Sequence, residues 1–111
     1  MKVETITKKA AILARCSSEA NVCDQILQLK QYAAGKYIVG EDDIYGDNIG
    51  GASALTERAE LQKLMRNIEQ GKKRYDIILI QDASRLGKTT EQIQEITNWF
   101  AEKNIQLHFH R

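Results

Sequence analysis

The sequence predicts an α/β fold, a three-layer sandwich in which a mainly parallel four-stranded sheet is flanked by helices. Short apolar runs typical of buried strands alternate with amphipathic helical patterns, in the order β-α-β-α-β-α-β. The strongest run, Tyr75–Ile80, is of the kind expected when helices cover both faces of a sheet. Helices that connect parallel strands in this way make right-handed crossovers.

The length and composition indicate one globular domain. The chain has 111 residues, of which 28% are charged and 42% hydrophobic. Lys and Arg outnumber Asp and Glu by only 16 to 15, so any nucleic-acid site must come from a local cluster of cations. Cys16 and Cys23 lack metal-ligand spacing, which favours small buried residues in a reducing compartment. Without a signal-peptide pattern or a membrane-spanning run, we expect a cytoplasmic domain with no membrane partner.

The first half of the chain predicts two strands around one helix. The stretch Ala11–Ser18 predicts a buried first strand whose C-terminal end presents Arg15 and Ser17 to a site. Apolar residues then recur at helical spacing over 22–33, and Gly35 ends this helix. Tyr37–Val39 predicts a weak second strand. The acidic, glycine-bearing stretch 41–54 predicts a surface loop.

The second half predicts two helices and two strands. An apolar stripe over 61–68 forms a helix that Gly71 ends, and the strand Tyr75–Ile80 leads into a polar loop over 81–88. Thr89 to Gln92 matches a capping box that starts the third helix. Alternation over 105–109 predicts a last strand, with His108 and His110 facing solvent rather than binding a metal.

Ligands of parallel α/β sheets gather at the carboxyl ends of the strands, where three predicted loops, 15–18, 42–58 and 82–88, converge. Arg58 and Lys88 stand near helix N-termini, where a cation opposes the helix dipole. Cations at these unfavourable positions indicate either a functional site or side chains that extend into solvent. Together with Arg15 and Arg85, these cations suit a multiply charged anion, most simply phosphate.

Ser17 is the candidate nucleophile for attack at phosphorus, although Ser17 or Ser18 could instead cap the following helix. On an extended chain Arg15 and Ser17 point the same way. Arginines supply the charge that stabilises such a reaction, so no metal is required. A magnesium site at Asp42, Asp43 and Asp47 is a minor alternative.

Two other enzyme classes fit less well. A cysteine phosphatase needs an arginine six positions after its cysteine, where this chain has Val22 after Cys16. A receiver domain of a signalling relay has its acidic pair after the first strand. Here Asp42 and Asp43 follow the predicted second strand, although Asp82 and Lys88 would fit.

Three segments resemble motifs of the serine recombinases, the resolvase/invertase family. The segment Ala14–Ser18 resembles Y-A-R-V-S-T, with Leu13 in place of Tyr and Cys16 in place of Val. Asp47–Gly51 with Arg58–Leu61 is similar to D-x-x-S-G and R-x-x-L. Ile80–Lys88 is similar to D-R-L-G-R, in the variant D-x-S-R-x-G-R. The resemblance runs in order from about residue 10 to 109.

The resemblance implies site-specific DNA recombination in which Ser17 attacks a DNA phosphodiester and forms a 5′-phosphoserine link, leaving a free 3′-hydroxyl. Arg15, Arg58 and Arg85 would bind and polarise the phosphate. The residues with implied supporting roles are Asp47, Gln25, Asp82, Ser84 and Lys88. The family uses neither metal nor another cofactor. Its partners are DNA and further copies of the protein, as a homo-dimer or tetramer.

Some residues depart from the family pattern. Lys88 replaces an arginine, Gly50 replaces a serine, and Ser84 stands where many members have aspartate. Family members continue into a dimerisation helix and a DNA-binding domain, so the sequence resembles a catalytic domain alone, which we expect to be inactive by itself. A catalytically silent interaction module of the same fold is the alternative.

Overall fold

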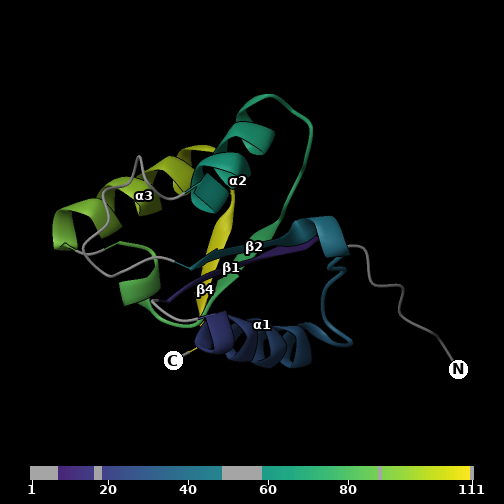
Figure 1. Ribbon diagram of the computed structural model, residues 1–111. Helices are drawn as coiled ribbons and strands as arrows, with labels where there is room; N and C mark the ends of the chain where they lie inside the picture. The colour runs from purple at the N-terminus through teal and green to yellow at the C-terminus, as the bar shows by residue number, and fades with distance from the viewer. Residues whose placement is uncertain (1–7, 17–18, 49–58, 88, 111) are drawn as a thin grey trace, which may run out of the picture.

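The computed structural model describes residues 8–16, 19–48, 59–87 and 89–110, and shows a four-stranded parallel sheet with the strand order β2-β1-β3-β4 (Figure 1). The strands are β1 (Ala10–Cys16), β2 (Ile44–Asn48), β3 (Ile77–Ile80) and β4 (Gln106–Phe109). The helices are α1 (Glu19–Ala33), α2 (Ala59–Glu69) and α3 (Thr90–Glu102). Two 3-10 turns, η1 (Glu41–Asp43) and η3 (Ala83–Arg85), precede β2 and follow β3.

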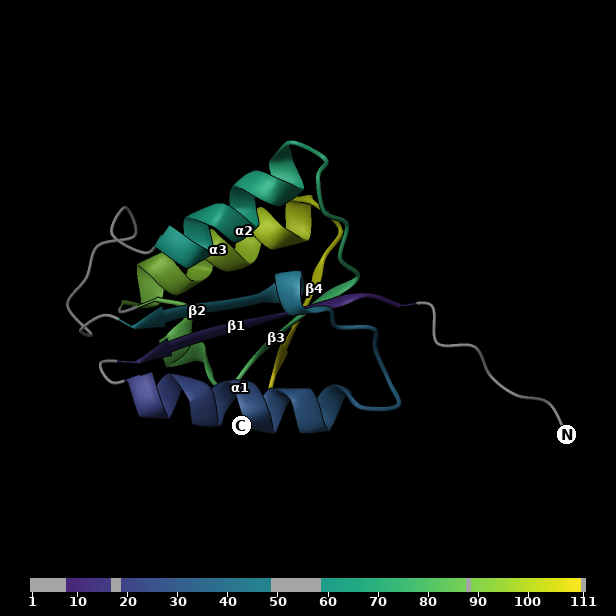
Figure 2. The same cartoon turned by 45° about the vertical axis from the view of Figure 1, so that its right-hand side comes forward.

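The sheet is the middle of three layers, as the sequence predicts. In Figure 2, α1 lies below the sheet, and α2 and α3 lie above it. Alternate residues of β1 enter the two cores: Ala11 and Leu13 pack toward α2 and α3, and Ala10 and Ile12 pack toward α1. All four side chains are fully buried, which explains why this strand is an uninterrupted apolar run.

The register sets where the strands end. β1 pairs with β3 only from Ala10↔Ile77 to Leu13↔Ile80, whereas its pairing with β2 continues to Cys16↔Asn48. The end of β1 therefore runs past the end of β3. This overhang carries Arg15 beyond the last residue of its neighbour, toward the turn that follows β3.

The helix boundaries follow local signals. Gly35 and Gly71, just after α1 and α2, have φ angles of 80° and 72°, in the left-handed region that favours glycine. The Thr89 hydroxyl accepts a hydrogen bond from the Gln92 amide at 3.1 Å, which confirms the predicted threonine cap of α3. None of the helices in the described residues has the length and apolarity to cross a membrane.

The prediction of the second strand was wrong. Ile38 makes only an isolated bridge with Lys9, while the paired strand β2 lies at Ile44–Asn48, within the predicted loop. The turn η1 separates the two segments, because the Asp43 side chain turns inward and accepts a hydrogen bond from the Gly40 amide at 2.8 Å. A strand that contains Gly46 and Asp47 carries little of the apolar signal on which strand prediction depends.

The last strand is as predicted, but of His108 in the strand and His110 just after it, only one faces solvent. His110 is exposed, whereas His108 is half-buried and stacks on Tyr32 of α1, with ring centroids 4.4 Å apart and an angle of 9° between the planes. The prediction for His108 was therefore wrong, because α1 covers this part of β4. Burial, followed by the charges of His110 and Lys36, lowers the pKa of His108 below its usual value.

Candidate functional site

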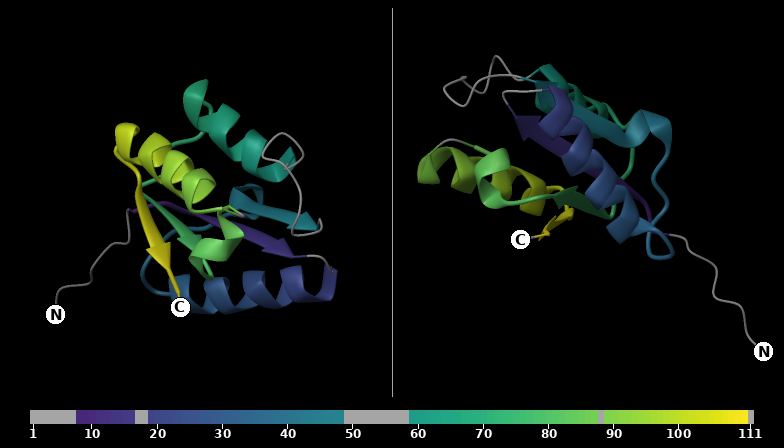
Figure 3. Two further views of the ribbon diagram at one scale, coloured as in Figure 1. Left: turned by 90° about the vertical axis from the view of Figure 1, so that its left-hand side faces the viewer. Right: turned by 60° about the horizontal axis from the view of Figure 1, so that its bottom comes forward.

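The carboxyl edge of the sheet brings together five of the residues singled out from the sequence: Arg15, Gln25, Asp82, Ser84 and Arg85. Arg15 is only 6% exposed. It lies on the same face of β1 as Leu13, and its Nη2 atom donates a hydrogen bond to the Ser84 carbonyl at 2.7 Å. The guanidinium is therefore fixed on the turn η3. In the ribbon of Figure 3 this part of the chain lies between β3 and α3.

Gln25 holds the backbone of Arg15. Its Oε1 atom accepts a hydrogen bond from the Arg15 amide at 3.2 Å, and its Nε2 atom donates one to the Arg15 carbonyl at 3.1 Å. Since β3 ends opposite Leu13, these Arg15 groups lie beyond the paired part of β1 and β3. A side-chain amide from α1 thus satisfies a buried donor and a buried acceptor that would otherwise carry a desolvation cost.

Asp82 closes the turn η3. It is the N-cap residue of this turn, and its Oδ1 atom accepts hydrogen bonds from the Ser84 amide, at 3.0 Å, and from the Ser84 hydroxyl. The second carboxylate oxygen, Oδ2, lies 3.8 Å from Nε of Arg85. The acid therefore uses one oxygen to shape the turn and faces an arginine with the other.

Gly87 fixes the position of this turn against α3. A Cβ atom added at Gly87 would lie 2.9 Å from the Gln92 Cβ atom and 3.1 Å from the backbone nitrogen of Ile93. These distances leave no room for a side chain. Gly87 is thus a point of close approach between backbones, and it ties η3 to the start of α3.

Three of the predicted site residues, Ser17, Arg58 and Lys88, lie outside the described residues. Asp47 lies in β2, and its Cα atom pairs in register with that of Arg15. This register places the backbone of Asp47 beside that of Arg15 at the carboxyl edge.

Asp42 and Asp43 do not lie at this edge, so the prediction that the loop from Asp42 converges there was wrong for its first residues. Both belong to η1, which precedes β2 and stands at the amino edge. Asp43 is buried, and its Oδ1 atom lies 3.3 Å from Nζ of Lys73. The described residues contain no group of three His, Cys, Asp or Glu side chains placed to hold a metal ion.

A buried polar network at the amino edge escaped sequence reasoning. Tyr75 donates to Asp43 at 2.8 Å, and its oxygen lies 2.9 Å from that of Tyr45, which accepts from Asn67 at 3.1 Å. Burial by itself raises the pKa of the Asp43 carboxyl. Hydrogen bonds from Gly40 and Tyr75, together with the hydrogen bond and charge of Lys73, outweigh this effect and hold the pKa below its usual value. No sequence spacing indicates this network, because its members come from η1, β2, α2 and the segment before β3.

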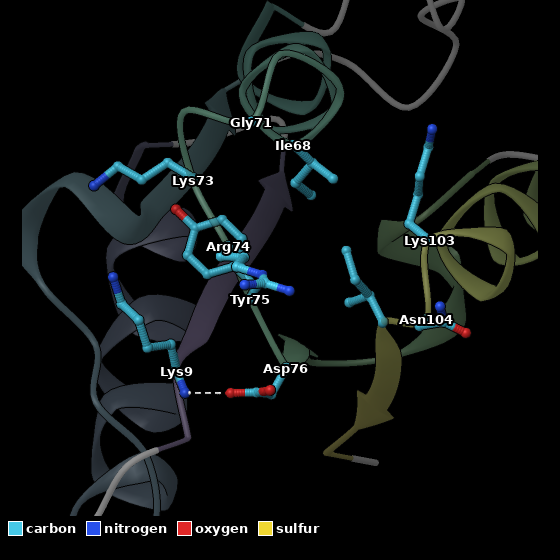
Figure 4. A pocket seen from close by; sticks show the side chains of 10 residues that line it. Lys9, Ile68, Gly71, Lys73, Arg74, Tyr75, Asp76, Lys103 and Asn104 are labelled. Atoms are coloured by element: carbon cyan, nitrogen blue, oxygen red, sulfur yellow. Dashed lines mark hydrogen bonds between the residues drawn. The ribbon is translucent and has the colours of Figure 1, made fainter.

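A pocket of about 770 Å³ also lies at the amino edge, between the ends of α2 and α3 (Figure 4). Its charged lining includes Lys9, Lys73, Arg74, Asp76 and Lys103. Lys73 pairs with Asp43, and Lys103 pairs with a carboxylate of α2 at 2.7 Å, so two of the cations are already neutralised. Helix C-termini carry partial negative charge, which disfavours an anion there. This pocket is therefore less suited to binding an anion than the carboxyl edge is.

The carboxyl edge suits an anionic oxygen-rich group. Arg15 uses one of its five N–H donors on Ser84, and the Nε atom of Arg85 is buried without a hydrogen-bond partner in the described part of the chain. Guanidinium groups bind phosphate through two parallel hydrogen bonds. Arg85 on the turn η3 and Arg15 hydrogen-bonded to the same turn are therefore a basis for phosphate chemistry.

Comparisons with known proteins agree with this chemistry. The chain matches the family described as "Resolvase, N terminal domain" over residues 10–111. It is similar to the C-terminal catalytic domain of ISC1926 TnpA, an IS607-like serine recombinase, with 25% identity over 93% of this chain and 67% of that one, and a TM-score of 0.75. It is also similar to the N-terminal catalytic domain of TP901-1 integrase, with 28% identity over 93% of this chain and 77% of that one, and a TM-score of 0.78. Among curated proteins, none matches significantly. The chain belongs to the resolvase family and is a serine recombinase catalytic domain.

Proposed function

We propose that Ser17 of this recombinase domain is the nucleophile that cuts DNA, and that Arg15, Arg58 and Arg85 bind the scissile phosphate. The observation that carries this proposal is the fixing of Arg15 on the turn of Arg85, two residues before Ser17 in the chain. The family match supports the reaction class.

The reaction conserves the phosphate ester. The Ser17 hydroxyl oxygen loses its proton and attacks phosphorus, a new P–O bond to serine forms, and the bond to the 3′ oxygen breaks. The 3′ oxygen takes up a proton and leaves as a free 3′-hydroxyl, while the 5′ phosphate stays on the protein. A 3′-hydroxyl of another strand reverses these steps in rejoining. Since one ester is exchanged for another, no external energy source is needed.

Arginines act in this scheme by stabilising charge on the phosphate oxygens as the bonds exchange. The lateral oxygens gain negative charge in the transition state, and guanidinium groups placed beforehand need little reorganisation. Gln25 supports this by holding the backbone of Arg15 from α1. Asp47 and Lys88 complete the proposed supporting residues, with Lys88 as a point charge in place of a planar fork.

The proposed partners are duplex DNA and further copies of the same protein. Recombination exchanges strands between two cut duplexes, so at least two active sites must act together. The catalytic domain is C-terminal in one structural relative and N-terminal in the other, so this fold occurs at either end of longer proteins.

A covalent adduct with DNA tests the proposal. Full-length protein incubated with a nicked suicide substrate should retain DNA on Ser17, and mass spectrometry of the digested adduct should locate the phosphoserine. Ser17→Ala should abolish the adduct because it removes the attacking oxygen. Ser18→Ala is the matched control, which loses an adjacent hydroxyl and should keep the adduct.

Two results would contradict the proposal. An adduct that persists in Ser17→Ala would assign the chemistry to another group. A wild-type protein that forms no adduct while it binds its DNA would favour the alternative of a catalytically silent interaction module.

A further inference from the structure

At the carboxyl edge, Asp82 contacts Ser84, which holds Arg15, and it also contacts Arg85 directly. Its Oδ1 atom holds the Ser84 amide at 3.0 Å, and the carbonyl of the same Ser84 receives Nη2 of Arg15 at 2.7 Å. Its Oδ2 atom lies 3.8 Å from Nε of Arg85. The Asp82 carboxylate is therefore linked to Arg15 through Ser84 and forms an ion pair directly with Arg85.

The Arg85 contact is an ion pair rather than a hydrogen bond. A separation of 3.8 Å exceeds hydrogen-bond length, and the Nε atom of Arg85 is buried with no acceptor in the described residues. A buried unpaired N–H is rare and calls for an explanation. Here the carboxylate attracts the guanidinium without occupying its donor, which stays available for another acceptor.

Asp82 also brings a negative charge to the turn η3, which contains Arg85 and whose Ser84 carbonyl accepts the hydrogen bond from Arg15. Its carboxylate lies 3.8 Å from Nε of Arg85 and attracts that guanidinium by opposite charge. The resemblance implies a supporting role for Asp82, but the sequence does not divide that role between the two carboxylate oxygens, because the division depends on side-chain direction.

We propose that Asp82 is the positioning residue of the cleavage reaction: its carboxylate sets the place of Arg15 through the Ser84 carbonyl and the direction of Arg85 through its charge. The rate effect rests on the proposed function, whereas the placement of the arginines does not. The purely structural explanation is that Asp82 only caps η3.

Asp82→Asn separates the two explanations. Asparagine is as good an N-cap residue as aspartate, so it keeps an acceptor for the Ser84 amide and removes only the charge. Asp42→Asn is the matched control, since it removes a carboxylate from the other 3-10 turn, η1, which lies at the amino edge. If Asp82→Asn does not fold, Asp82→Ser supplies another uncharged capping residue.

The first measurement is the NMR signals of the arginine Nε–Hε groups in this chain. Asp82→Asn should shift the signals of Arg15 and Arg85, and Asp42→Asn should shift neither. The second is the single-turnover rate of adduct formation by the full-length protein. Asp82→Asn should lower it about 100-fold, the loss expected when groups around a reacting centre are misplaced. The melting temperature should stay close to that of the wild type.

The proposal is overturned if Asp82→Asn leaves the two arginine signals unchanged, or if it shifts them and still forms the adduct at the wild-type rate. Failure of the wild type to form any adduct would instead reject the proposed function. In that case the NMR signals still decide whether Asp82 holds the arginines.

Discussion

Gln25 shows how one side chain substitutes for part of a strand. Its amide pairs with the N–H and C=O of Arg15 where β1 has run past β3. Gln25 is only 4% exposed, so water does not easily replace it. The conformation of the residue that bears the guanidinium thus depends on a helix rather than on the sheet.

Gln25→Ala should therefore destabilise the domain by about 2 kcal/mol, because it leaves a donor and an acceptor without partners in a buried setting. Urea unfolding followed by circular dichroism measures this loss. Gln31→Ala is the matched control on the same helix, at an exposed position, and should change stability by less than about 0.5 kcal/mol. Equal stability of the two variants would show that Gln25 is dispensable to the fold.

Among the elements, the turn η3 depends on its contact with α3. Gly87→Ala places a methyl group 2.9 Å from the Gln92 Cβ atom and 3.1 Å from the Ile93 nitrogen, so the turn or the helix must move. Overpacking of this kind costs about 1 to 3 kcal/mol. We expect a corresponding loss in urea unfolding, and a shift in the Arg85 Nε–Hε signal as η3 is displaced.

Gly87→Val adds a larger group at the same place and should cost more than Gly87→Ala. An alanine variant as stable as the wild type would contradict a dependence of η3 on this close contact with α3.

The segment 37–48 shows where prediction at the level of elements stops. Tyr37–Val39 has the composition of a strand, yet only Ile38 forms a bridge, and Ile38 is 44% exposed. Pairing resumes only at Ile44, after Asp43 has entered the core and bonded to Gly40 and Tyr75. The position of β2 thus follows from a tertiary contact with a residue more than thirty positions away, and local propensity cannot report it.

Two groups in the described part of the molecule should each lower its stability as pH falls. The folded-state pKa of His108 is lowered by burial and by the charges of His110 and Lys36, so below pH 6.5 the unfolded chain binds more protons than the folded one. Asp43 also has a lowered folded-state pKa, so its contribution is lost as pH falls from 3.8 through the folded value. Urea unfolding measured from about pH 4.5 to 8, the range in which histidine titrates, isolates the contribution of His108.

His108→Phe keeps a ring for stacking on Tyr32 and removes the titrating group. The decrease in unfolding free energy below pH 6.5 should therefore be smaller in this variant. A pH dependence identical to that of the wild type would assign this decrease to other groups.

Sequence reasoning predicted the layers and, among the elements that the structure describes, all three helices and three of the four strands, because each has a periodic apolar pattern or a clear stop such as Gly35 or Gly71. It selected Arg15, Gln25 and Arg85 through motif spacing and the rule that ligands gather at strand ends. It could not predict that one carboxylate oxygen of Asp82 accepts hydrogen bonds within the turn while the other faces Arg85, since this depends on the direction of the side chain. It also misplaced Asp43, whose burial requires partners from other elements.

The strand order also determines how the chain guards against aggregation. The two strands with the most apolar sequences, β1 and β3, occupy the middle of the sheet, and the more polar β2 and β4 lie at its edges. These edge strands have five and four residues, so each offers another chain only a short row of free backbone groups. The aggregation-prone apolar strand Ile77–Ile80 exposes its backbone groups only when β4 detaches or the sheet opens. Aggregation of this domain should therefore follow unfolding rather than contact between folded copies.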